Sequence, residues 1–324
     1  MRILITGRGS IAQRHAGWLR TLRPDAQLVV VSAHEEVAAA LQPCRVVKDF
    51  AAGLATQPDG IVIASVSDRH AAELLEALRL RLPCLVEKPL VTNRDELARL
   101  RSGVAAIPAG AQPAVAVGCN LRQLPGLGRL RDLLRSARVG RLVRAHLEVG
   151  QDLRQWRPGR DLQASYSADA ARGGGVVFDL VHEIDMASWL LGPLQVKAAI
   201  GGRLGGLLEK ADDVHVGLLR AASGHPVTIS LDYVSRRPVR RYVFVGTEAT
   251  VTCDVIGKSL VLADPGGSQE LAVEGDFDVA ATYRTQMAQW LGAWQADPAG
   301  SVASPLSDAF ETSELMLALL EEGR

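Results

Sequence analysis

The chain has 324 residues, 48% of them hydrophobic and 4% aromatic, which suits one large or two ordinary α/β domains. Its 36 basic residues balance its 36 acidic residues, so no bulk field attracts nucleic acid or an anionic membrane, and we expect neither partner. The four cysteines stand far apart, in neither a CxxC nor a metal-binding pattern. We therefore expect reduced thiols and no metal site.

The first half alternates strand-like and helical segments. Apolar runs of strand length cover residues 3–6, 28–32, 60–64, 84–87 and 115–118. Helical patterns cover 11–22, 70–80 and 93–102 between them. This alternation predicts a doubly wound parallel sheet of the Rossmann type. No leader precedes the first strand and no apolar run is long enough to span a membrane, so the expected location is the cytoplasm.

A glycine-rich turn follows the first strand. Gly7, Gly9 and Ala12 match G-x-G-x-x-A, and Ser10 and Ile11 open the next helix. Such a turn brings a pyrophosphate against the backbone and the helix N-terminus. These residues are predicted to bind a dinucleotide; the alternative is a tight turn with no ligand.

The end of the second strand bears on the choice of dinucleotide. An NAD site usually carries Asp or Glu there, but this chain has Ser32, and its glutamates, Glu35 and Glu36, come late. Ser32 and His34 could donate to a 2′-phosphate, yet no arginine stands beside Ser32. The cofactor is therefore NAD or NADP, with the choice left open.

The third strand runs into Ser65, Ser67 and Asp68, and then into a helix. Ser67 or Asp68 is a candidate N-cap of this helix. Ser65, Ser67 and His70 are candidate cofactor contacts at the carboxyl end of the sheet. For His70 the alternative is simple packing at the start of the helix.

The fourth strand ends in Glu87-Lys88-Pro89. Pro89 disfavours helical geometry at Lys88, so the chain leaves the sheet extended. Ligands bind at the carboxyl ends of parallel strands, which directs Lys88 toward the crevice. The chain has only five lysines, which argues against surface filler. A surface turn with a solvated ion pair is the alternative.

The second half predicts a different architecture. A helix is expected at 126–137 and strands at 142–150, 196–200, 214–219, 227–233, 241–245, 249–254 and 259–262. Consecutive strands with short turns favour an antiparallel sheet. Amphipathic helices are expected at 281–296 and 305–322. The predicted domains are residues 1–119, a Rossmann domain, and 120–324, an α+β domain with a large, mostly antiparallel sheet.

A run of three glycines at 173–175 precedes a helix that ends at Gly192. At helical spacing Asp179, His182 and Asp185 fall near one face. Two carboxylates beside a histidine would orient it and raise its pKa, which suits a general acid–base group. The alternative is an acidic helix face with a structural histidine.

These motifs together resemble the Gfo/Idh/MocA family, which includes glucose–fructose oxidoreductase and inositol dehydrogenase. The matching pieces are residues 7–12, 87–89, 120–122 and 173–192, in the family's order and spacing. The resemblance implies NAD(P)-dependent oxidation or reduction of a sugar, cyclitol or related carbonyl compound. It also implies that the outer face of the C-terminal sheet pairs subunits into homodimers or homotetramers.

The resemblance assigns roles to single residues. Lys88 matches the active-site lysine, His182 the catalytic histidine and Asp185 the acid three residues later. Asp179 lies three residues before the histidine, where many members have their aspartate four before. Glu87 is implied to contact the cofactor side of the site and to hold Lys88, while Asn120 and Arg122 are implied to contact substrate.

A second set of residues resembles a sub-group associated with bacterial surface-polysaccharide and nonulosonic-acid genes. Trp156-Arg157-Pro158 and Tyr166-Ser167-Ala168 carry this likeness. It implies substrate contacts from Trp156, Arg157 and Tyr166, together with Asp179 and His182, and a sugar nucleotide or acidic sugar as substrate. Nearby arginines, Arg154 and Arg236 among them, could bind phosphate or carboxylate. The alternative for each, which the sequence alone favours, is a solvated surface position.

The implied mechanism has His182 take a proton from a ring hydroxyl while Lys88 stabilises the developing alkoxide. Lys88 is the alternative proton carrier if burial lowers its pKa. Two other functions stay open: a non-catalytic dinucleotide-binding regulator, and a sugar-modifying enzyme that uses tightly held NAD as an internal redox relay.

Overall fold

The structure is a computed structural model that describes residues 1–156, 159, 161–163, 165–296 and 302–323. Contacts divide the chain into two compact units. The first contains Met1–Asn120 and Ala280–Phe310, and the second contains Leu121–Val279 and Glu311–Arg324. The sequence had suggested one boundary, at 119/120. The structure differs in that residues 280–310 group with the N-terminal part of the chain.

Helix α9 (Val279–Ala296) explains this grouping. Its Met287, Trp290 and Leu291 are buried in the same hydrophobic core as Ile3 and Ile5. Gln286 Nε2 also donates to the oxygen of Val117, at 3.0 Å. The helix was predicted correctly, but an amphipathic pattern does not say which sheet the apolar face covers.

The first unit is built on a six-stranded parallel sheet, which confirms the predicted Rossmann architecture. The strand order is β3-β2-β1-β4-β5-β6. The strands are β1 (Arg2–Thr6), β2 (Gln27–Val31), β3 (Arg45–Val47), β4 (Gly60–Ile63), β5 (Cys84–Val86) and β6 (Val115–Val117). The sequence missed β3 because this strand has only three residues, none of them buried.

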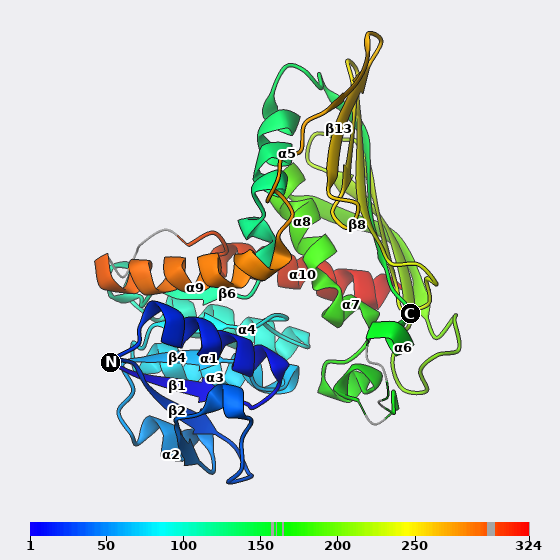
Figure 1. The fold of residues 1–324 in the computed structure, drawn as a ribbon. Coiled ribbons are helices and arrows are strands. Elements are labelled where there is room, and N and C mark those ends of the chain that lie inside the picture. The colour runs from blue at the N-terminus through cyan, green and yellow to red at the C-terminus, as the bar shows by residue number, and fades with distance from the viewer. Residues whose placement is uncertain (157–158, 160, 164, 297–301, 324) are drawn as a thin grey trace. The chain divides into compact units, whose positions relative to one another are not determined.

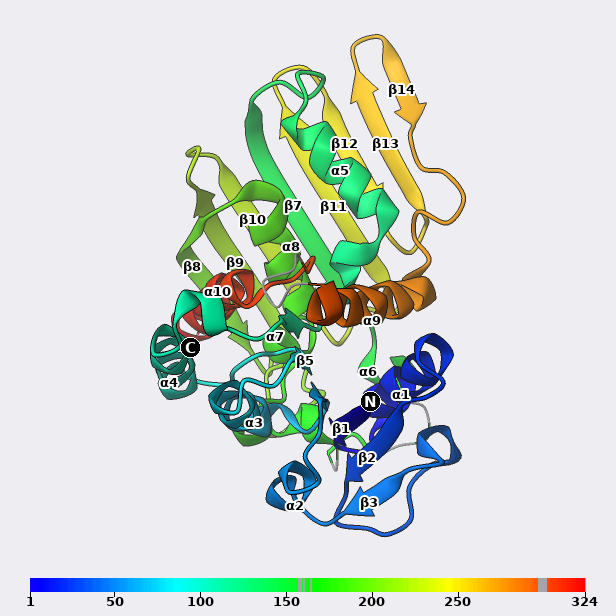
Figure 2. The ribbon, with the colours of Figure 1, turned by 90° about the vertical axis from the view of Figure 1, so that its left-hand side faces the viewer.

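Helices cover both faces of this sheet. They are α1 (Ser10–Leu22), α2 (Phe50–Leu54), α3 (Ser67–Arg79) and α4 (Arg94–Ala105), with α2 unpredicted. Ala12, Ala16 and Leu19 of α1 pack with Ile3 and Ile5. On the other face, Gly53 of α2 lies against Leu4 and Val31. Figure 2 shows α1 and α2 on opposite sides of β2.

The predicted N-cap of α3 is wrong. The helix begins at Ser67 itself, Val66 occupies the N-cap position, and no side chain caps the helix. By contrast, Asn93 does cap α4, since its side chain accepts from Glu96 N at 2.9 Å. Glu96 in turn accepts from Thr92 N at 2.7 Å, which completes a reciprocal cap.

The second unit is built on an eight-stranded sheet of order β14-β13-β12-β11-β7-β10-β9-β8. Every neighbouring pair is antiparallel except β7 and β10, which confirms the predicted, mostly antiparallel sheet. The strands are β7 (Leu142–Gly150), β8 (Leu194–Gly202), β9 (Val214–Ala221), β10 (Pro226–Asp232), β11 (Val239–Gly246), β12 (Thr250–Asp254), β13 (Ser259–Asp264) and β14 (Gly267–Glu270). Because β7 and β10 are parallel neighbours, their C-terminal ends lie side by side at the same end of the strands.

One face of this sheet is covered by helices and the other is not. The helices are α5 (Pro125–Arg135), α6 (Leu153–Trp156), α7 (Val176–Asp179), α8 (Val181–Leu191) and α10 (Leu306–Glu322). Figure 1 shows α5 and α8 along the same face. On β11, Tyr242 and Phe244 are fully buried, whereas β8 and β9 expose Ile200, Val216 and Leu218. This alternation is the expected pattern for a sheet packed on one side.

The helix predicted after the glycine run is two helices. The helical run breaks at Leu180, whose φ and ψ are −98° and 26°, so Asp179 ends α7 and His182 lies in α8. Gly192, at φ 79°, ends α8 as predicted. Among the described residues, no helix is both long and apolar enough to cross a membrane.

Candidate active site

The backbone conformation and packing of the protein require a glycine at the first position of the glycine-rich turn. Gly7 has a φ of +86°, a conformation that favours glycine. A Cβ on Gly7 would also lie 2.4 Å from the backbone oxygen of Ala64. This glycine therefore lets the β1–α1 turn pack against the end of β4.

The second glycine has no such reason inside the protein. Gly9 has φ −69° and ψ −179°, which any residue adopts, and a Cβ there would meet no atom within 4 Å. Gly9 and Ser10 are exposed, Ile11 is half-buried and Ala12 is buried against the sheet. No side chain caps α1, and its first turn contains no acid. Open space beside uncapped N–H groups fits the pyrophosphate of a dinucleotide.

Ser32 behaves differently from the prediction. Its hydroxyl donates to the oxygen of His34 at 2.8 Å and accepts from His34 N at 3.0 Å. The single hydroxyl proton is therefore used within the turn, and only a lone pair remains. In this arrangement Ser32 can accept from a ribose hydroxyl, whereas donation to a 2′-phosphate is left to His34.

His70 ties together the loops that follow β4 and β5. Its Nδ1 lies 2.8 Å from the oxygen of Pro89 and its Nε2 lies 3.1 Å from the oxygen of Ser65. The side chain is buried, as is Ser67, while the Ser65 hydroxyl donates to Glu73 at 2.9 Å. His70 therefore shapes the loop around Lys88 through the backbone, as in the packing alternative, and its predicted contact with the cofactor stays a prediction.

Glu87 pairs with a residue that the sequence did not single out. Its Oε1 lies 2.7 Å from Nε2 of His15, a fully buried residue of α1. A Cβ on Gly118, at the end of β6, would lie 2.7 Å from Glu87 Oε2, so this glycine makes room for the carboxylate. Glu87 is thus packed inside the first unit and positions the loop, while its predicted contact with the cofactor stays a prediction.

The charge of Glu87 is retained despite its burial. Burial alone would raise the pKa of this carboxyl, but the hydrogen bond and charge of His15, together with the charges of Lys88 and His70, hold the pKa below its ordinary value. Glu87 Oε2 also accepts from the backbone N–H of Lys88 at 3.3 Å. The half-buried Lys88 therefore starts from a fixed backbone position, followed by a cis bond to Pro89.

In the second unit, Asp179 is the centre of a hydroxyl network. Tyr166 donates to its Oδ1 at 2.8 Å, and Ser167 and Tyr233 donate to its Oδ2 at 2.5 and 2.7 Å. The carboxylate is only 2% exposed. Three hydroxyl donors hold the end of α7 in one place, directly before the helix that carries His182.

The glycine run at 173–175 brings two of these donors to Asp179. A Cβ on Gly174 would lie 2.1 Å from the oxygen of Tyr166. The N–H groups of Gly174 and Gly175 donate to the oxygens of Asp169 and Ser167, at 2.9 and 2.8 Å. These glycines therefore admit the chain's own backbone, which seats Tyr166 and Ser167 against α7.

Asp185 is committed to a buried ion pair. Its two oxygens accept from Arg122 Nε and Nη2 at 2.9 and 2.7 Å, and Thr312 adds a third bond at 3.0 Å. The side chains of Arg122 and Asp185 are 1% and 0% exposed. Arg122 and Asp185 thus anchor α8, and their predicted roles toward substrate stay predictions.

His182 itself lies half-buried on α8, between anchored neighbours. Glu183 accepts from Tyr242 Oη at 2.9 Å and pairs with Arg240 at 2.8 Å, which fixes α8 to β11. Asp179, Glu183 and Asp185 therefore hold the chain before and along α8, and the predicted placement of His182 between two carboxylates stays a prediction.

The remaining predicted substrate residues are Asn120, Trp156 and Arg157. Asn120, in the first unit, is buried and donates to Thr282 at 2.7 Å. Trp156 is 40% exposed and its ring centroid lies 6.3 Å from that of Tyr233. Arg157 lies outside the described residues. Among those that are described, no group of three or more His, Cys, Asp or Glu is arranged to hold a metal ion.

Sequence reasoning missed His15, Ser167 and Tyr233. His15 occupies the buried face of α1 with Ala12, Ala16 and Leu19, where a polar side chain signals a partner. Tyr233 follows directly on β10 and reaches Asp179 from 54 residues further along the chain. No spacing in the sequence reveals that contact.

A Rossmann sheet with an open glycine turn, joined to a second unit built on a mostly antiparallel sheet, defines a two-domain dinucleotide-dependent enzyme. Two family models match the chain: "Oxidoreductase family, NAD-binding Rossmann fold" over residues 1–106 and "GFO/IDH/MocA C-terminal domain" over residues 127–252. The chain therefore belongs to the Gfo/Idh/MocA family and is an NAD(P)-dependent dehydrogenase that acts on CH–OH groups.

Individual relatives agree with this assignment. The chain is 28% identical to an inositol 2-dehydrogenase of Acidothermus cellulolyticus, over 90% of this chain and 84% of that protein. It is 24% identical to inositol 2-dehydrogenase 2 of Paenarthrobacter aurescens, over 99% and 95%. Its fold is similar to that of levoglucosan dehydrogenase in complex with NADH and levoglucosan, with a TM-score of 0.85, 17% identity and coverage of 100% and 97%.

Proposed function

We propose that the protein transfers a hydride between NAD and a CH–OH carbon of a sugar, cyclitol or sugar derivative, with Lys88 and His182 as catalytic residues. The observation that carries the dinucleotide part is Gly9, a glycine that neither its backbone conformation nor any neighbour requires. The turn of Ser32 favours NAD over NADP, since its hydroxyl can accept from a ribose but has no proton left to donate.

The nicotinamide ring supplies the hydride acceptor or donor when the cofactor is bound. His182 takes the proton of the substrate hydroxyl, and Lys88 donates a hydrogen bond to the same oxygen as negative charge develops there. Lys88 as proton carrier remains the second version of this step. In either version the carboxylates beside these residues act by positioning: Glu87 fixes the backbone of Lys88, and Asp179 fixes the start of the His182 helix.

Two variants test the catalytic roles. Lys88→Ala and His182→Ala should each lower kcat by about 100-fold or more, the usual contribution of a positioned acid–base group. NAD affinity, measured by calorimetry, should survive. Lys197→Ala, which removes an exposed lysine of β8, is the matched control and should leave kcat unchanged. Full turnover in the Lys88 variant would remove Lys88 from the chemistry.

The substrate class is tested with a panel of sugars and cyclitols, starting from myo-inositol because the named relatives are inositol 2-dehydrogenases. Release of NADH into solution during turnover supports a simple dehydrogenase. Turnover of a sugar with no NADH released would instead support an internal redox relay. Bound NAD that is never reduced by any member of the panel would support a regulator.

We also propose that the uncovered face of the second sheet binds a second copy of this chain. Ile200, Val216 and Leu218 are 71%, 43% and 43% exposed on adjacent strands, which is a cluster of aliphatic side chains that the described part of the chain leaves uncovered. Light scattering should give a homodimer or homotetramer, and Val216→Glu with Leu218→Glu should lower its mass. A monomeric wild type would contradict this proposal.

A further inference from the structure

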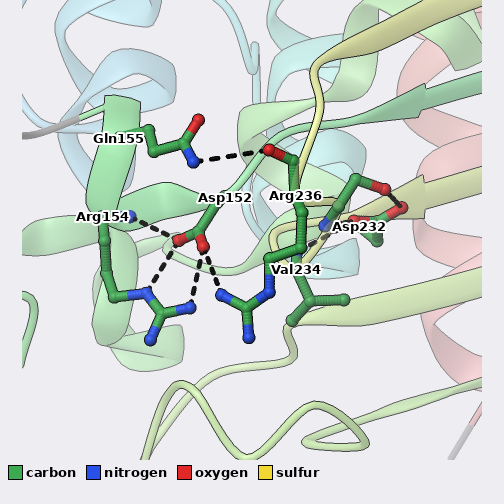
Figure 3. A network of polar contacts seen from close by, with 7 residues as sticks. Asp152, Arg154, Gln155, Asp232, Val234 and Arg236 are labelled. Carbon is green, nitrogen blue, oxygen red and sulfur yellow. Dashed lines mark hydrogen bonds and ion pairs between the residues drawn. The ribbon is translucent and has the colours of Figure 1, made fainter.

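Two arginines from different strand ends meet on one buried carboxylate (Figure 3). Arg154 Nε and Nη2 donate to Asp152 at 2.9 and 2.7 Å, and Arg236 Nη1 donates to the same Oδ2 at 2.7 Å. Arg154 Nη2 and Arg236 Nη1 each lie 2.7 Å from Asp152 Oδ2, so these two nitrogen atoms are close neighbours. Figure 3 shows the two guanidinium groups next to each other on the same side of Asp152.

Backbone hydrogen bonds join the two chain segments that carry these arginines, which follow β7 and β10. Asp232, at the end of β10, accepts from Val234 N and Ser235 N at 2.8 and 2.6 Å. The backbone N–H of Asp152 donates to the oxygen of Ser235 at 2.9 Å, which joins the loop after β7 to the loop after β10. The backbone that carries both arginines is therefore held by these bonds, and both guanidinium groups are held by the buried carboxylate of Asp152.

The cluster keeps unused hydrogen-bonding capacity. Asp152 is 2% exposed, while the side chains of Arg154 and Arg236 are 53% and 74% exposed. Within the described part of the chain, Arg154 Nη1 and Arg236 Nε and Nη2 have no hydrogen-bond partner. Two positive charges share one negative charge, so the cluster carries a net charge of about +1 with several N–H donors turned outward.

The cluster also lies at the same edge of the sheet as the Asp179 network. Tyr233 follows β10 directly, accepts from Leu153 N at 3.0 Å and donates to Asp179 at 2.7 Å. Trp156, two residues after Arg154, presents a 40% exposed indole near the Tyr233 ring. An oxyanion site and an aromatic surface therefore stand beside the network that positions α8.

We propose that Arg154 and Arg236 form an oxyanion-binding site that takes the phosphate or carboxylate of an anionic sugar derivative. Guanidinium groups bind planar carboxylates and phosphates through paired N–H donors, and holding both groups in advance lowers the entropy cost of binding. Phosphate and carboxylate share this chemistry, so the experiment has to separate them. The inference rests on the proposed dehydrogenase function and narrows its substrate class.

The test compares neutral and anionic ligands on NAD-loaded protein. Calorimetry with glucose, glucose 6-phosphate, glucuronate and UDP should show tighter binding of at least one anion, with an affinity that falls as salt is added. Arg236→Gln should weaken that anion about tenfold or more and leave glucose binding unchanged. Arg236 is the better residue to change because Arg154 still pairs with Asp152 in the variant. The ligand that loses most affinity identifies the source, phosphate or carboxylate.

Arg129→Gln is the matched control. Arg129 of α5 is also half-exposed on a buried carboxylate, Asp276, but among the described residues no second arginine bonds that carboxylate. Equal loss of anion affinity in both variants would overturn the proposal, as would an absence of anion binding in wild type. If NAD binding and turnover of a neutral sugar persist in that case, only this inference fails and the proposed dehydrogenase stands.

Discussion

The two glycine-rich segments resemble each other in sequence but differ in what their glycines admit. Both precede a helix, and each helix contributes to a buried polar contact beside a predicted catalytic residue: α1 to His15–Glu87 next to Lys88, and α7 to Asp179 before His182. At Gly9 an added Cβ meets nothing, whereas at Gly174 it meets the backbone of Tyr166 at 2.1 Å. The first segment leaves room for a ligand and the second leaves room for the protein's own chain.

The largest effect should come from Gly174→Ala. The new Cβ would overlap the oxygen of Tyr166, and separating them moves Tyr166 and Ser167 away from Asp179. We expect a loss of about 3 kcal/mol in the free energy of unfolding, measured with urea, and a large fall in kcat. A variant with wild-type stability would break the comparison, because the second glycine run would then have no packing role.

A smaller loss is expected from Asp179→Asn. Hydroxyl groups donate to both oxygens of the carboxylate, and an amide of the same shape replaces one of these two acceptors with an NH2 donor. The cost should be about 2 kcal/mol. Tyr233→Phe should lose much of its own effect when Asp179 is already Asn, which a double-mutant cycle measures. Additive losses would show that Tyr233 acts elsewhere.

Gly9→Ala should show most clearly that the first glycine segment serves a ligand and the second serves the fold. Its stability should stay within about 0.5 kcal/mol of wild type, since the site has no neighbours. NAD affinity should fall about tenfold, or about 1.4 kcal/mol, because the methyl group occupies the approach of the pyrophosphate. Calorimetry with NAD checks this. An unchanged affinity would leave Gly9 without an explanation.

The smallest effect should be a pH dependence of stability that comes from Asp152, in the loop after β7. The hydrogen bond from Arg154, with those of its backbone N–H and Arg236, lowers the pKa of Asp152 below its ordinary value against the opposing effect of burial. A carboxyl with a lowered folded-state pKa stabilises the fold above its unfolded pKa of about 3.9, and this stabilisation is lost as the pH falls below that value. The melting temperatures of wild type and Asp152→Asn should therefore differ at neutral pH and converge in acid. A constant difference would argue against the ionised pair.

Local patterns were sufficient for most of the architecture. The parallel strands, the boundaries of β7 and the end of α8 at Gly192 follow from apolar runs and glycine placement. The exposed β14 and the three-residue β3 gave no signal, because a strand at the edge of a sheet need not bury alternate residues. The break at Leu180 was missed, since residues on both sides are apolar and good helix formers.

The site was harder to predict than the fold because its supports are distant in sequence. Residues at motif positions were found, but their partners were assigned by proximity along the chain: Glu87 to Lys88, and Asp179 and Asp185 to His182. In the structure these carboxylates bond His15, Tyr233 and Arg122, which are 54 to 72 residues away. Sequence spacing identifies candidate site residues, whereas tertiary packing determines which groups form hydrogen bonds with them.

The return of residues 280–310 to the first unit has a consequence for synthesis. When a ribosome has made residues 1–120, the strands of the nucleotide-binding sheet exist, but Met287, Trp290 and Leu291, which pack with Ile3 and Ile5, have not been made. Folding of the nascent chain therefore cannot finish in N- to C-terminal order. An N-terminal fragment ending at residue 120 would expose that apolar face and aggregate, whereas a fragment extended through residue 310 includes its own cover.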